Sequence, residues 1–517
     1  MIDNNILEQV KGVFSNLKNR YILSVAYDKS HEKATEFKSF IDDFVSCSDK
    51  LSATYTEGEK FSFSILRNED NTGISFKGIP NGHEFTSLLL AILNADGQGK
   101  NMPDEHISQR IMSLDGEIHL QTYISLTCTN CPEVVQSLNA MALKNAKITH
   151  EMIDGGVYPE EVERLNIQSV PCVYANGKLI HVGRGDLGKL LQQLEDKIGT
   201  THNESNNIIE KDFDLIVVGG GPAGASSAIY SARKGLKVAV VAERVGGQVN
   251  DTTGIENITS IPHTTGTKLA SDLRQHMGEY NIEIFDNRQV VDVDFAGKVK
   301  SIKVRGGEIF KAPAVVVATG ASWRRLGLEG EEAYIGHGVH FCPHCDGPFY
   351  KGKDVAVIGG GNSGIEAAID LAGICNKVTV LEFAEEMRAD EVLLKKLSEL
   401  PNVESFTMAQ TTELLGDGTK LSGIKVKNRN SGEEQEISLQ GVFVQIGLAP
   451  NTSVFDGKIE LTPRKEIVID SSNRTSTVGI YAAGDATTVP YKQITIAMGE
   501  GAKAALSAFD DRMRGVI

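Results

Sequence analysis

The stretch Phe213-Asp-Leu-Ile-Val-Val-Gly-Gly-Gly-Pro-Ala-Gly224 decides the fold of the C-terminal part of the chain. Its apolar run predicts a buried strand, and the glycines after it predict a tight turn into a helix that reaches Lys234. In such a unit the first glycine permits the turn, the second lets backbone approach a pyrophosphate, and the third lets helix and strand pack closely. The anion then lies at the helix N-terminus. The stretch therefore predicts an α/β fold with a dinucleotide site.

The same pattern returns in Asp354-Val-Ala-Val-Ile-Gly-Gly-Gly-Asn-Ser-Gly364, which leads into a predicted helix that ends at Ala372. One glycine motif is weak evidence, but two copies, each between an apolar strand and a helix, would hardly arise from glycine punctuation alone. Each copy is followed, at the end of the next predicted strand, by an acid that can accept hydrogen bonds from a ribose hydroxyl. These acids are Glu243 and Glu382. The chain is therefore expected to bind two dinucleotides.

The residues around Glu382 predict which nicotinamide coenzyme the second site takes. They read Leu381-Glu-Phe-Ala-Glu-Glu386, with no Arg or Lys before Arg388. A 2′-phosphate there would face carboxylates rather than a guanidinium, so the sequence predicts NADH in preference to NADPH.

Two cysteine pairs have Cys-x-x-Cys spacing: Cys128 with Cys131, and Cys342 with Cys345. Both pairs are predicted at helix N-termini, where the helix dipole and free amides lower a thiol pKa below its free value of about 8.5. Asp346 is a candidate proton donor and acceptor, with an exposed capping carboxylate as the alternative. The pairs are too far apart in sequence for zinc-ribbon spacing. We therefore expect redox disulfides and no metal site.

The segment after Cys131 fits a thioredoxin fold. Val170-Pro171 is followed by a predicted strand, Cys172 to Ala175, and by an Asn-Gly turn, and a cis-proline loop at this place would face the disulfide. Cys172 is either a buried cysteine that fills a small space or a third thiol able to exchange with Cys128.

Composition and charge restrict the classes of function. With 517 residues, 41% of them hydrophobic and 23% charged, the chain is expected to be an ordinary protein of several domains. A formal charge of −16 disfavours nucleic acid or anionic lipid as a partner. No leader-like N-terminus and no run of 18 apolar residues is present, so neither export nor a membrane location is expected. Paired cysteines with redox spacing favour the cytoplasm.

A polar stretch that begins Gly199-Thr-Thr-His-Asn-Glu-Ser-Asn-Asn and continues as a charged run to Asp212 predicts a linker. Before it, two segments of about one hundred residues each have helix-strand-helix-strand character and are candidates for a tandem repeat. Their predicted strands begin at Tyr21 and Ile118.

Taken together, the motifs resemble one known family over essentially the whole chain. They stand in the order found in low-molecular-weight thioredoxin reductases, and the N-terminal half narrows the resemblance to the flavoprotein subunits of alkyl hydroperoxide reductases, which reduce two-cysteine peroxiredoxins. The motifs that carry the resemblance are Gly219-Gly-Gly-Pro-Ala-Gly224, Gly246-Gly-Gln248, Ala318-Thr-Gly320, Cys342-Pro-His-Cys345-Asp-Gly, Gly359-Gly-Gly-Asn-Ser-Gly364 and Ala483-Gly-Asp485.

The resemblance implies an architecture of two Rossmann-like nucleotide-binding domains preceded by two fused thioredoxin-like folds, in a homodimer. The implied parts are a fold without Cys-x-x-Cys (1–100), a fold with it (101–198), the linker (199–212), an FAD domain in two pieces (213–324 and 446–517) and an inserted NADH domain with the second disulfide (325–445). The resemblance excludes the glutathione reductase type, in which the redox cysteines follow the first nucleotide fold. Here the stretch Gly247-Gln-Val-Asn-Asp-Thr-Thr253 has no cysteine, and the pair comes later, in the inserted domain.

The resemblance also implies residue roles. FAD would be held by Gly219, Gly221, Gly224, Glu243, Gln248, Asp485 and Gln493, and NADH by Gly359, Gly361, Gly364 and Glu382. Cys342 and Cys345 would be the flavin-linked pair, with Cys345 nearer the flavin. Glu84 resembles a family acid near Cys128 and Cys131, with a helix-capping role as the alternative.

One departure from the family is visible in the first thioredoxin-like fold. This chain reads Lys60-Phe61-Ser62 where members commonly have proline, and the fold has no Cys-x-x-Cys, so it is not expected to be a redox centre.

The function implied is a relay: hydride from NADH to FAD, electrons to Cys342 and Cys345, exchange to Cys131 and Cys128, and attack by Cys128 on a peroxiredoxin disulfide. A rotating NADH domain and an arm that swings on the linker would serve this relay. Two alternatives stay open, a general NADH-dependent disulfide reductase and a redox-sensing binding module in which turnover is incidental.

Overall fold

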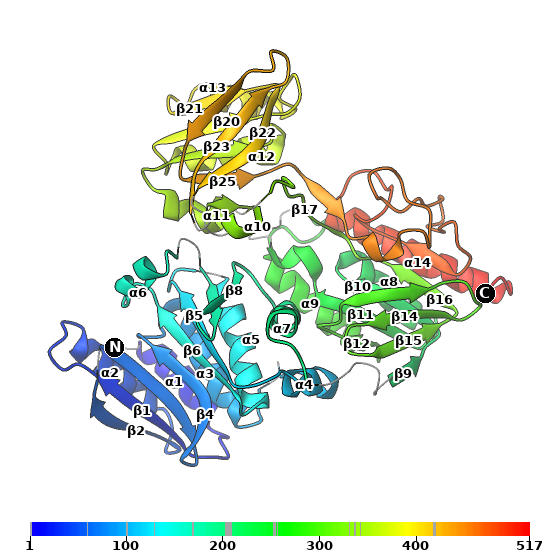
Figure 1. Ribbon diagram of the computed structural model, residues 1–517. Helices are drawn as coiled ribbons and strands as arrows, with labels where there is room; N and C mark the ends of the chain where they lie inside the picture. The colour runs from blue at the N-terminus through cyan, green and yellow to red at the C-terminus, as the bar shows by residue number, and fades with distance from the viewer. Residues whose placement is uncertain are drawn as a thin grey trace. The chain divides into compact units, whose positions relative to one another are not determined.

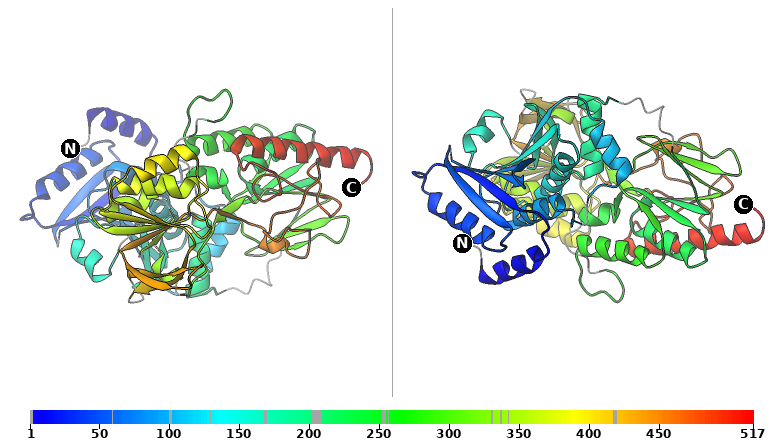
Figure 2. Two further views of the ribbon diagram at one scale, coloured as in Figure 1. Left: turned by 90° about the horizontal axis from the view of Figure 1, so that it is seen from above. Right: turned by 90° about the horizontal axis from the view of Figure 1, so that it is seen from below.

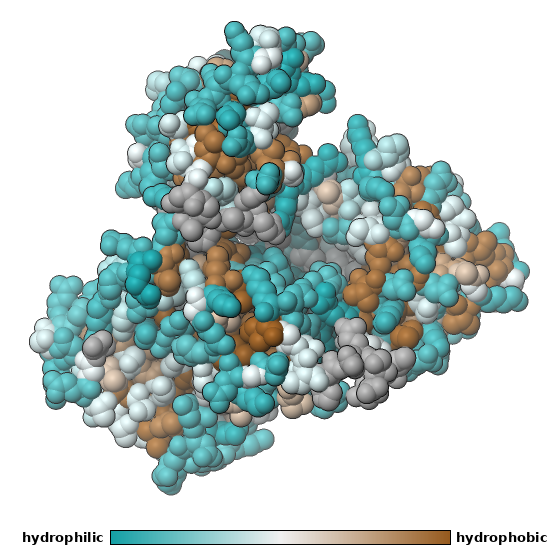
Figure 3. Space-filling model, in the orientation of Figure 1, coloured by the Kyte–Doolittle hydropathy of each residue, from teal (hydrophilic) through white to brown (hydrophobic). Residues whose placement is uncertain are grey.

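The structure is a computed structural model that describes residues 3–58, 60–99, 102–128, 130–167, 170–201, 209–251, 255, 257–329, 331–335, 338–341, 343–416 and 420–517 (Figure 1). The chain forms two compact units: residues 1–201 with 325–446, and residues 202–324 with 447–517. No helix in the described ranges is long and apolar enough to cross a membrane. The face drawn in Figure 3 is mostly hydrophilic, with scattered apolar patches.

The N-terminal region contains one eight-stranded sheet of order β2-β1-β3-β4-β6-β5-β7-β8. Its strands are β1 (Tyr21–Tyr27), β2 (Leu51–Glu57), β3 (Phe61–Arg67), β4 (Asp70–Lys77), β5 (Ile118–Ile124), β6 (Ile148–Asp154), β7 (Cys172–Ala175) and β8 (Lys178–Val182). Its helices are α1 (Asn4–Phe14), α2 (Ala34–Val45), η1 (Gly82–Glu84), α3 (Phe85–Ala95), α4 (Glu105–Met112), α5 (Cys131–Lys144), α6 (Pro159–Arg164) and α7 (Leu187–Ile198).

The two halves of this sheet have the same topology, which confirms the predicted repeat. In the first half β1 pairs in parallel with β2 and antiparallel with β3, and β3 pairs antiparallel with β4. In the second half β5, β6, β7 and β8 repeat these pairings. Parallel pairing of β4 with β6 joins the halves. The sheet is therefore continuous, and each half gives the other a strand partner that it would otherwise lack.

Lys60, the departure from the family pattern, contacts the second half of the sheet. Its φ angle is +48°. Its Nζ donates a hydrogen bond of 3.0 Å to the Val157 carbonyl oxygen and lies 4.8 Å from the centre of the Tyr158 ring. The Tyr158 hydroxyl in turn donates to the Phe61 carbonyl oxygen at 2.9 Å. Lys60 of the first fold therefore binds to residues of the second fold and stabilises the contact between the two.

The second unit is built on a parallel sheet of order β12-β11-β10-β16-β27. Its strands are β10 (Leu215–Gly220), β11 (Val238–Val245), β12 (Glu283–Phe285), β16 (Ala314–Val317) and β27 (Ile480–Ala482). The helices are α8 (Pro222–Ala232), α9 (Gly266–Gly278) and α14 (Ile494–Met513). Helices α8 and α14 lie side by side (Figure 2). Gly501 of α14 permits this close approach, because a Cβ at this position would lie 2.0 Å from the Ala223 carbonyl oxygen of α8.

A smaller sheet of order β13-β14-β15-β9 belongs to the same unit. Its strands are β13 (Val290–Asp294), β14 (Lys300–Val304), β15 (Glu308–Ala312) and β9 (Ile209–Asp212). Strand β9 consists of the last four residues of the predicted linker, and residues 202–208 lie outside the described residues. This edge strand was not predicted, because its charged sequence has no strand pattern. The Lys211 Nζ in it contacts the buried Glu308 carboxylate at 2.8 Å.

The inserted segment 325–446 has its own parallel sheet of order β18-β25-β19-β20-β21. The strands are β18 (Val339–His340), β19 (Asp354–Ile358), β20 (Lys377–Leu381), β21 (Val403–Phe406) and β25 (Gly441–Val444), with helices α10 (Glu331–Tyr334), α12 (Asn362–Ala372) and α13 (Glu391–Ser398). A three-stranded antiparallel sheet consists of β22 (Ala409–Gly416), β23 (Leu421–Asn428) and β24 (Glu434–Ser438). The predicted α/β class is thus confirmed.

The chain enters and leaves this inserted segment next to a two-stranded ribbon. Strand β17 (Ala321–Trp323) precedes the insertion, β26 (Leu448–Pro450) follows it, and the two strands pair antiparallel. The Arg324 amide donates to the Gly447 carbonyl oxygen at 2.9 Å. The two crossings are therefore adjacent in space.

Candidate redox and nucleotide sites

The first glycine loop connects β10 to α8 as the sequence predicts. Gly219 has φ +112°, and a Cβ there would lie 2.1 Å from the Ala318 carbonyl oxygen. A Cβ on Gly224 would lie 1.9 Å from the Gly219 carbonyl oxygen. Gly221 differs, because a Cβ there would meet nothing closer than 3.9 Å. Packing thus requires the first and third glycines, while the middle one borders open space.

The second glycine loop, between β19 and α12, repeats this geometry. A Cβ on Gly359 would lie 2.2 Å from the Gln445 carbonyl oxygen, and one on Gly364 would lie 1.9 Å from the Gly359 carbonyl oxygen. Gly361 again has nothing within 4 Å of a Cβ position. Gly221 and Gly361 are also the N-caps of α8 and α12, and neither helix has a side-chain cap. Both loops therefore fit a pyrophosphate at a helix N-terminus.

Other predicted FAD residues lie on elements next to the first loop. Glu243 is exposed near the end of β11, two residues before Val245, which pairs with Gly220. Gln248 is in the short helix η3 (Gly247–Asp251), and the Gly246 amide just before it donates to the Gly220 carbonyl oxygen at 2.8 Å. The acid and the Gln248 turn are thus tied to the glycine loop.

Asp485 and Gln493 come from the C-terminal piece of the same unit. A Cβ on Gly484 would lie 3.0 Å from the Cβ of Ala223, so the turn that carries Asp485 packs on the first turn of α8. Burial raises the pKa of Asp485, and the Lys492 ammonium opposes that shift. Gln493 directly precedes α14, is exposed, and accepts a 3.1 Å hydrogen bond from the Asn257 side chain.

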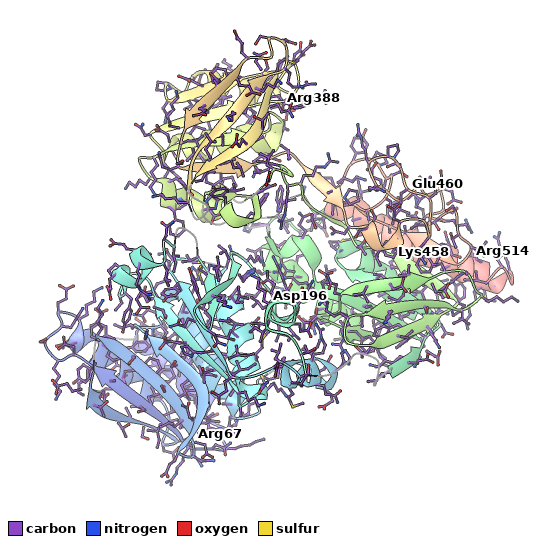
Figure 4. All side chains as sticks on the ribbon, in the orientation of Figure 1. Arg67, Asp196, Arg388, Lys458, Glu460 and Arg514 are labelled. Atoms are coloured by element: carbon purple, nitrogen blue, oxygen red, sulfur yellow. A yellow bond between two sulfur atoms is a disulfide. The ribbon has the colours of Figure 1, made fainter. Side chains whose placement is uncertain are left out.

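Glu382 lies beside the second glycine loop. Its carboxylate accepts hydrogen bonds from the Gly360 amide at 2.5 Å and from the Ala384 amide at 2.8 Å. Arg388 is exposed (Figure 4), and its backbone amide donates to the Gly360 carbonyl oxygen at 2.8 Å. A carboxylate held at this place fits a ribose hydroxyl.

A cation that sequence reasoning missed contacts the residue after Glu382. The Arg429 guanidinium lies 3.7 Å from the centre of the Phe383 ring, and its Nη1 donates to the Phe383 carbonyl oxygen at 2.9 Å. No motif signals this pair, because Arg429 comes from the turn between β23 and β24. The acidic run therefore has one guanidinium beside it, and the preference for NADH stays a prediction.

Cys128 and Cys131 form a disulfide at the N-terminus of α5. The Cys131 amide donates to the Cys128 sulfur at 3.2 Å. Cys131 is fully buried, whereas Cys128 is partly exposed. The Val170–Pro171 peptide is cis, as predicted, and the Val170 carbonyl oxygen lies 3.8 Å from the Cys128 sulfur. Cys128 is therefore the sulfur that another protein can reach.

Cys172 and Glu84 each had two possible roles. Cys172 is fully buried in a cluster with Tyr123 and Tyr174, and burial raises its pKa to about 12, so the packing role is favoured. Glu84 is fully buried at the end of η1 and makes no capping hydrogen bond to α3. Burial raises the pKa of Glu84 to about 7, with a partial offset from the Ser87 hydroxyl.

The second cysteine pair is only partly described. Cys342 lies outside the described residues, and so does the side chain of Cys345, whose backbone is in the short helix α11 (Pro343–Asp346). Asp346 Oδ2 lies 3.1 Å from Nδ1 of the buried His340. The other ring nitrogen of His340 lies 2.7 Å from the Tyr350 hydroxyl oxygen. Asp346 therefore has a buried partner that its sequence neighbours did not indicate.

Comparisons with known proteins cover the whole chain. The family model for pyridine nucleotide-disulphide oxidoreductases matches residues 213–501, and a thioredoxin domain model matches residues 118–195. The F subunit of alkyl hydroperoxide reductase in Pseudomonas aeruginosa is 47% identical over 99% of both chains, and its namesake in Staphylococcus aureus is 45% identical over 99% of both. A Bacillus subtilis protein named NADH dehydrogenase is 46% identical over 99% of this chain and 100% of its own.

Solved structures resemble the C-terminal part. Thioredoxin reductase from T. acidophilum is 37% identical with a TM-score of 0.52, and covers 58% of this chain and 99% of its own. The enzyme from Lactococcus lactis, in the conformation called FR, is 30% identical with a TM-score of 0.54 at the same coverage.

Proposed function

The chain belongs to the family of alkyl hydroperoxide reductase F subunits, within the pyridine nucleotide-disulphide oxidoreductases, and from this premise we propose that it passes electrons from NADH to a two-cysteine peroxiredoxin. The observation that carries the proposal is the partly exposed Cys128 sulfur, in a disulfide beside the cis-proline loop, on the same chain as two nucleotide loops. A chain with these parts is suited to collect an electron pair at one place and deliver it to another protein.

The proposed site residues divide into three groups. FAD is assigned to Gly219, Gly221, Gly224, Glu243, Gln248, Asp485 and Gln493, and NADH to Gly359, Gly361, Gly364 and Glu382. The thiol chemistry is assigned to Cys342, Cys345, Cys131 and Cys128, with Asp346 as the proton donor and acceptor. When bound, the two cofactors supply hydride chemistry and the electron pair that opens the first disulfide.

The protein's own residues then move the electron pair by thiol exchange. Opening of the Cys342–Cys345 disulfide consumes two electrons and two protons and gives a dithiol. A thiolate of that dithiol attacks the Cys128–Cys131 disulfide, so that one pair is oxidised as the other is reduced. Cys128 finally attacks the disulfide of the peroxiredoxin and forms a mixed disulfide with it, and Cys131 then attacks Cys128, which releases the dithiol peroxiredoxin and restores the Cys128–Cys131 disulfide. The difference in reduction potential between the two pairs sets the direction of exchange between them.

The proposal includes the organisation of the molecule. The FAD domain comprises 213–324 and 446–517, the NADH domain 325–445, and the arm 1–198 with its linker at 199–212. The enzyme works as a homodimer in the cytoplasm. Rotation of the NADH domain about the ribbon of β17 and β26 presents the nucleotide and the disulfide to the flavin in turn.

Coupled turnover tests the proposal directly. NADH consumption should be rapid when a two-cysteine peroxiredoxin and a peroxide are both supplied, and slow when either is withheld. Stopped-flow spectroscopy of the flavin, with and without the peroxiredoxin, separates NADH oxidation from electron delivery. If NADH consumption does not depend on the peroxiredoxin, electron delivery as proposed is wrong.

A second candidate function is NADH oxidation with another final acceptor. The relative named NADH dehydrogenase, which matches this chain at full length, favours this candidate. It predicts that NADH consumption depends on oxygen or a dye and not on Cys128. A general disulfide reductase would instead turn over with many protein disulfides, and the same assay with unrelated disulfide proteins distinguishes it.

A further inference from the structure

Two phenylalanine rings are exposed at the carboxyl edge of the parallel sheet in the inserted segment. Phe383 follows β20 and is 53% exposed, and Phe406 ends β21, the neighbouring strand in Figure 1, and is 39% exposed. The Glu382 amide donates to the Phe406 carbonyl oxygen at 2.9 Å, so the two chain segments are adjacent. Open parallel sheets bind their ligands at this edge. Exposed aromatic rings here therefore point to a binding surface.

The Arg429 guanidinium lies over the Phe383 ring, and both its side chain and its backbone hold it there. The guanidinium carbon is 3.7 Å from the ring centre, and Nη1 donates to the Phe383 carbonyl oxygen at 2.9 Å. The Arg429 amide donates to the Met408 carbonyl oxygen, and the Met408 amide donates to the Ala384 carbonyl oxygen, both at 2.8 Å. Backbone hydrogen bonds therefore connect the turn that carries Arg429 to the residue after Phe383.

This stack of ring and guanidinium lies next to the residue predicted to hold the ribose. Glu382 directly precedes Phe383, and its carboxylate accepts a hydrogen bond of 2.5 Å from the Gly360 amide in the second glycine loop. In a dinucleotide bound as predicted, the pyrophosphate lies at that loop and the ribose at Glu382. The adenine is attached to the same ribose. It therefore lies close to this carboxylate, where the stack of Phe383 and Arg429 offers an exposed flat surface.

A guanidinium beside a nucleotide can act in two ways. Its N–H groups can pair with a phosphate, or its flat and weakly hydrated face can stack on an aromatic base. Arg429 is already in van der Waals contact with the Phe383 ring and has one N–H on a backbone carbonyl oxygen. The adjacent Glu382 carboxylate would repel a 2′-phosphate. These observations favour stacking over phosphate binding.

We propose that Arg429 is a specificity-determining residue for the coenzyme, which Phe383 holds as a stacking surface for adenine and not as a ligand for a 2′-phosphate. The inference rests on the proposed function, in which Glu382 holds the ribose of NADH. It adds that the guanidinium strengthens binding of the adenosine half of the coenzyme. The enzyme accordingly prefers NADH although a cation lies beside the acidic run.

Calorimetric titration of the full-length FAD-loaded enzyme tests this role with two probes, ADP-ribose and 2′-phospho-ADP-ribose. Phe383→Leu removes the aromatic ring but keeps an apolar side chain. Arg429→Lys keeps the positive charge but removes the flat guanidinium, whereas Arg429→Gln removes the charge. Both side chains are exposed, so the variants should fold like the wild type, which thermal unfolding checks.

We expect Phe383→Leu to weaken ADP-ribose binding by about tenfold, which corresponds to the loss of one contact between a base and an aromatic ring. Arg429→Lys should weaken it several-fold although the charge is kept, because an ammonium is not flat and is strongly hydrated. The wild type should bind 2′-phospho-ADP-ribose more weakly than ADP-ribose. Arg429→Gln should weaken the binding of both probes by a similar factor.

A matched control is Lys377→Gln, which removes one positive charge at the amino end of β20, the end opposite Glu382, and should leave both affinities unchanged. Unchanged ADP-ribose affinity in Phe383→Leu and Arg429→Lys would overturn the inference. A loss in Arg429→Gln that is confined to the phosphorylated probe would also overturn it, because the guanidinium would then be a phosphate ligand. If the affinities change as expected while NADH consumption does not depend on the peroxiredoxin, the proposed function fails and the role of Arg429 stands.

Discussion

Two cysteines of one thioredoxin-like fold show how environment decides thiol chemistry. Cys128 is partly exposed at the N-terminus of α5, whereas Cys172, next to the cis-proline, is sealed among tyrosines. We expect Cys128→Ser to reduce peroxiredoxin-dependent NADH consumption by roughly a hundredfold or more, since its disulfide partner Cys131 is fully buried and cannot replace the exposed nucleophile. Flavin reduction by NADH should be unaffected.

Cys172→Ser is the matched control, with an expected loss of activity below roughly twofold and only a modest loss of stability. Both variants are measured by coupled turnover and stopped-flow reduction. Undiminished peroxide turnover in Cys128→Ser would contradict the relay.

The buried Glu84 carboxyl makes the stability of the arm depend on pH. Its pKa is raised to about 7 by burial, while an unfolded chain has a glutamate pKa near 4.3. Between these values the unfolded state has lost the proton and the folded state keeps it, so stability falls as pH rises from about 4.5 to about 7 and then levels off. The full effect is on the order of 3 kcal/mol.

Glu84→Gln should abolish this fall in the stability of the arm with rising pH. The measurement is the opening free energy of α3 and α5 from amide hydrogen exchange at several pH values, corrected for intrinsic exchange rates. Glu105→Gln, at an exposed acid in the first turn of α4, serves as the control and should not alter the pH dependence. An equal fall with pH in wild type and Glu84→Gln would disprove the assignment.

Glu382 is expected to discriminate between the nicotinamide coenzymes. Glu382→Gln should raise the KM for NADH about tenfold, because a charged hydrogen-bond acceptor for ribose is lost. It should also reduce the ratio of kcat/KM for NADH to kcat/KM for NADPH. The ratio of kcat/KM for the two coenzymes checks this, with Glu404→Gln on β21 as a control for loss of one charge. Comparable wild-type efficiency with both coenzymes would remove the prediction.

At the level of single residues, the sequence identifies groups that belong to a spaced motif. The Cys-x-x-Cys pairs and the glycines are of this kind, because short spacing alone brings them together. His340 could not be identified, since it shares no spaced motif with Asp346, and Arg429 contacts Phe383 from the turn between β23 and β24. Assignments of residues to FAD and NADH stay predictions until a ligand is bound.

The glycine loops yield a prediction at the level of elements. At the start of α12, the N-cap Gly361 and the helical Gly364 face different surroundings. A Cβ at Gly364 would lie 1.9 Å from the Gly359 carbonyl oxygen, whereas one at Gly361 would meet nothing within 4 Å. Gly364→Ala should therefore destabilise the NADH domain by roughly 1–3 kcal/mol through overpacking. Gly361→Ala should fold normally and weaken NADH binding by about tenfold or more, because the methyl group takes the place of the pyrophosphate.

Thermal unfolding and titration with ADP-ribose distinguish the two effects. A Gly361→Ala protein that binds ADP-ribose as tightly as wild type would show that the pyrophosphate does not approach this glycine.

Elements with a strong apolar pattern were predictable, and charged ones were not. Strands β10 and β19 are apolar runs that precede glycines, and both were predicted within about a residue or two of their ends. Strand β9 was missed because Ile209-Glu-Lys-Asp212 has no strand periodicity and gains its structure from pairing with β15. The parallel contact of β4 with β6 joins residues more than seventy positions apart, which no local pattern specifies.

The two compact units lead to a prediction for the whole molecule. The last residue described before the gap, Thr201, donates from its backbone amide to the Ser113 carbonyl oxygen in the arm, and strand β9 begins at Ile209 in the other unit. Cleavage between these points should break none of the hydrogen bonds described. The cleaved enzyme should retain NADH-dependent flavin reduction but lose peroxiredoxin reduction about a hundredfold when diluted, because the arm is no longer held at high effective concentration.

Limited proteolysis followed by assays at increasing protein concentration measures this loss. Recovery of activity at high concentration is expected. Full activity of the cleaved and diluted enzyme would mean that the tether contributes nothing to electron delivery.

The ribbon formed by β17 and β26 has a consequence for how such a chain can be rebuilt. The backbone leaves and re-enters the sheet at neighbouring hydrogen-bonded positions, so residues 325–446 could be exchanged as one segment. A short turn from Arg324 to Gly447 would join the two strands that remain. A nucleotide-binding module of different coenzyme choice, grafted at the same two strand ends, would meet the same geometric requirement.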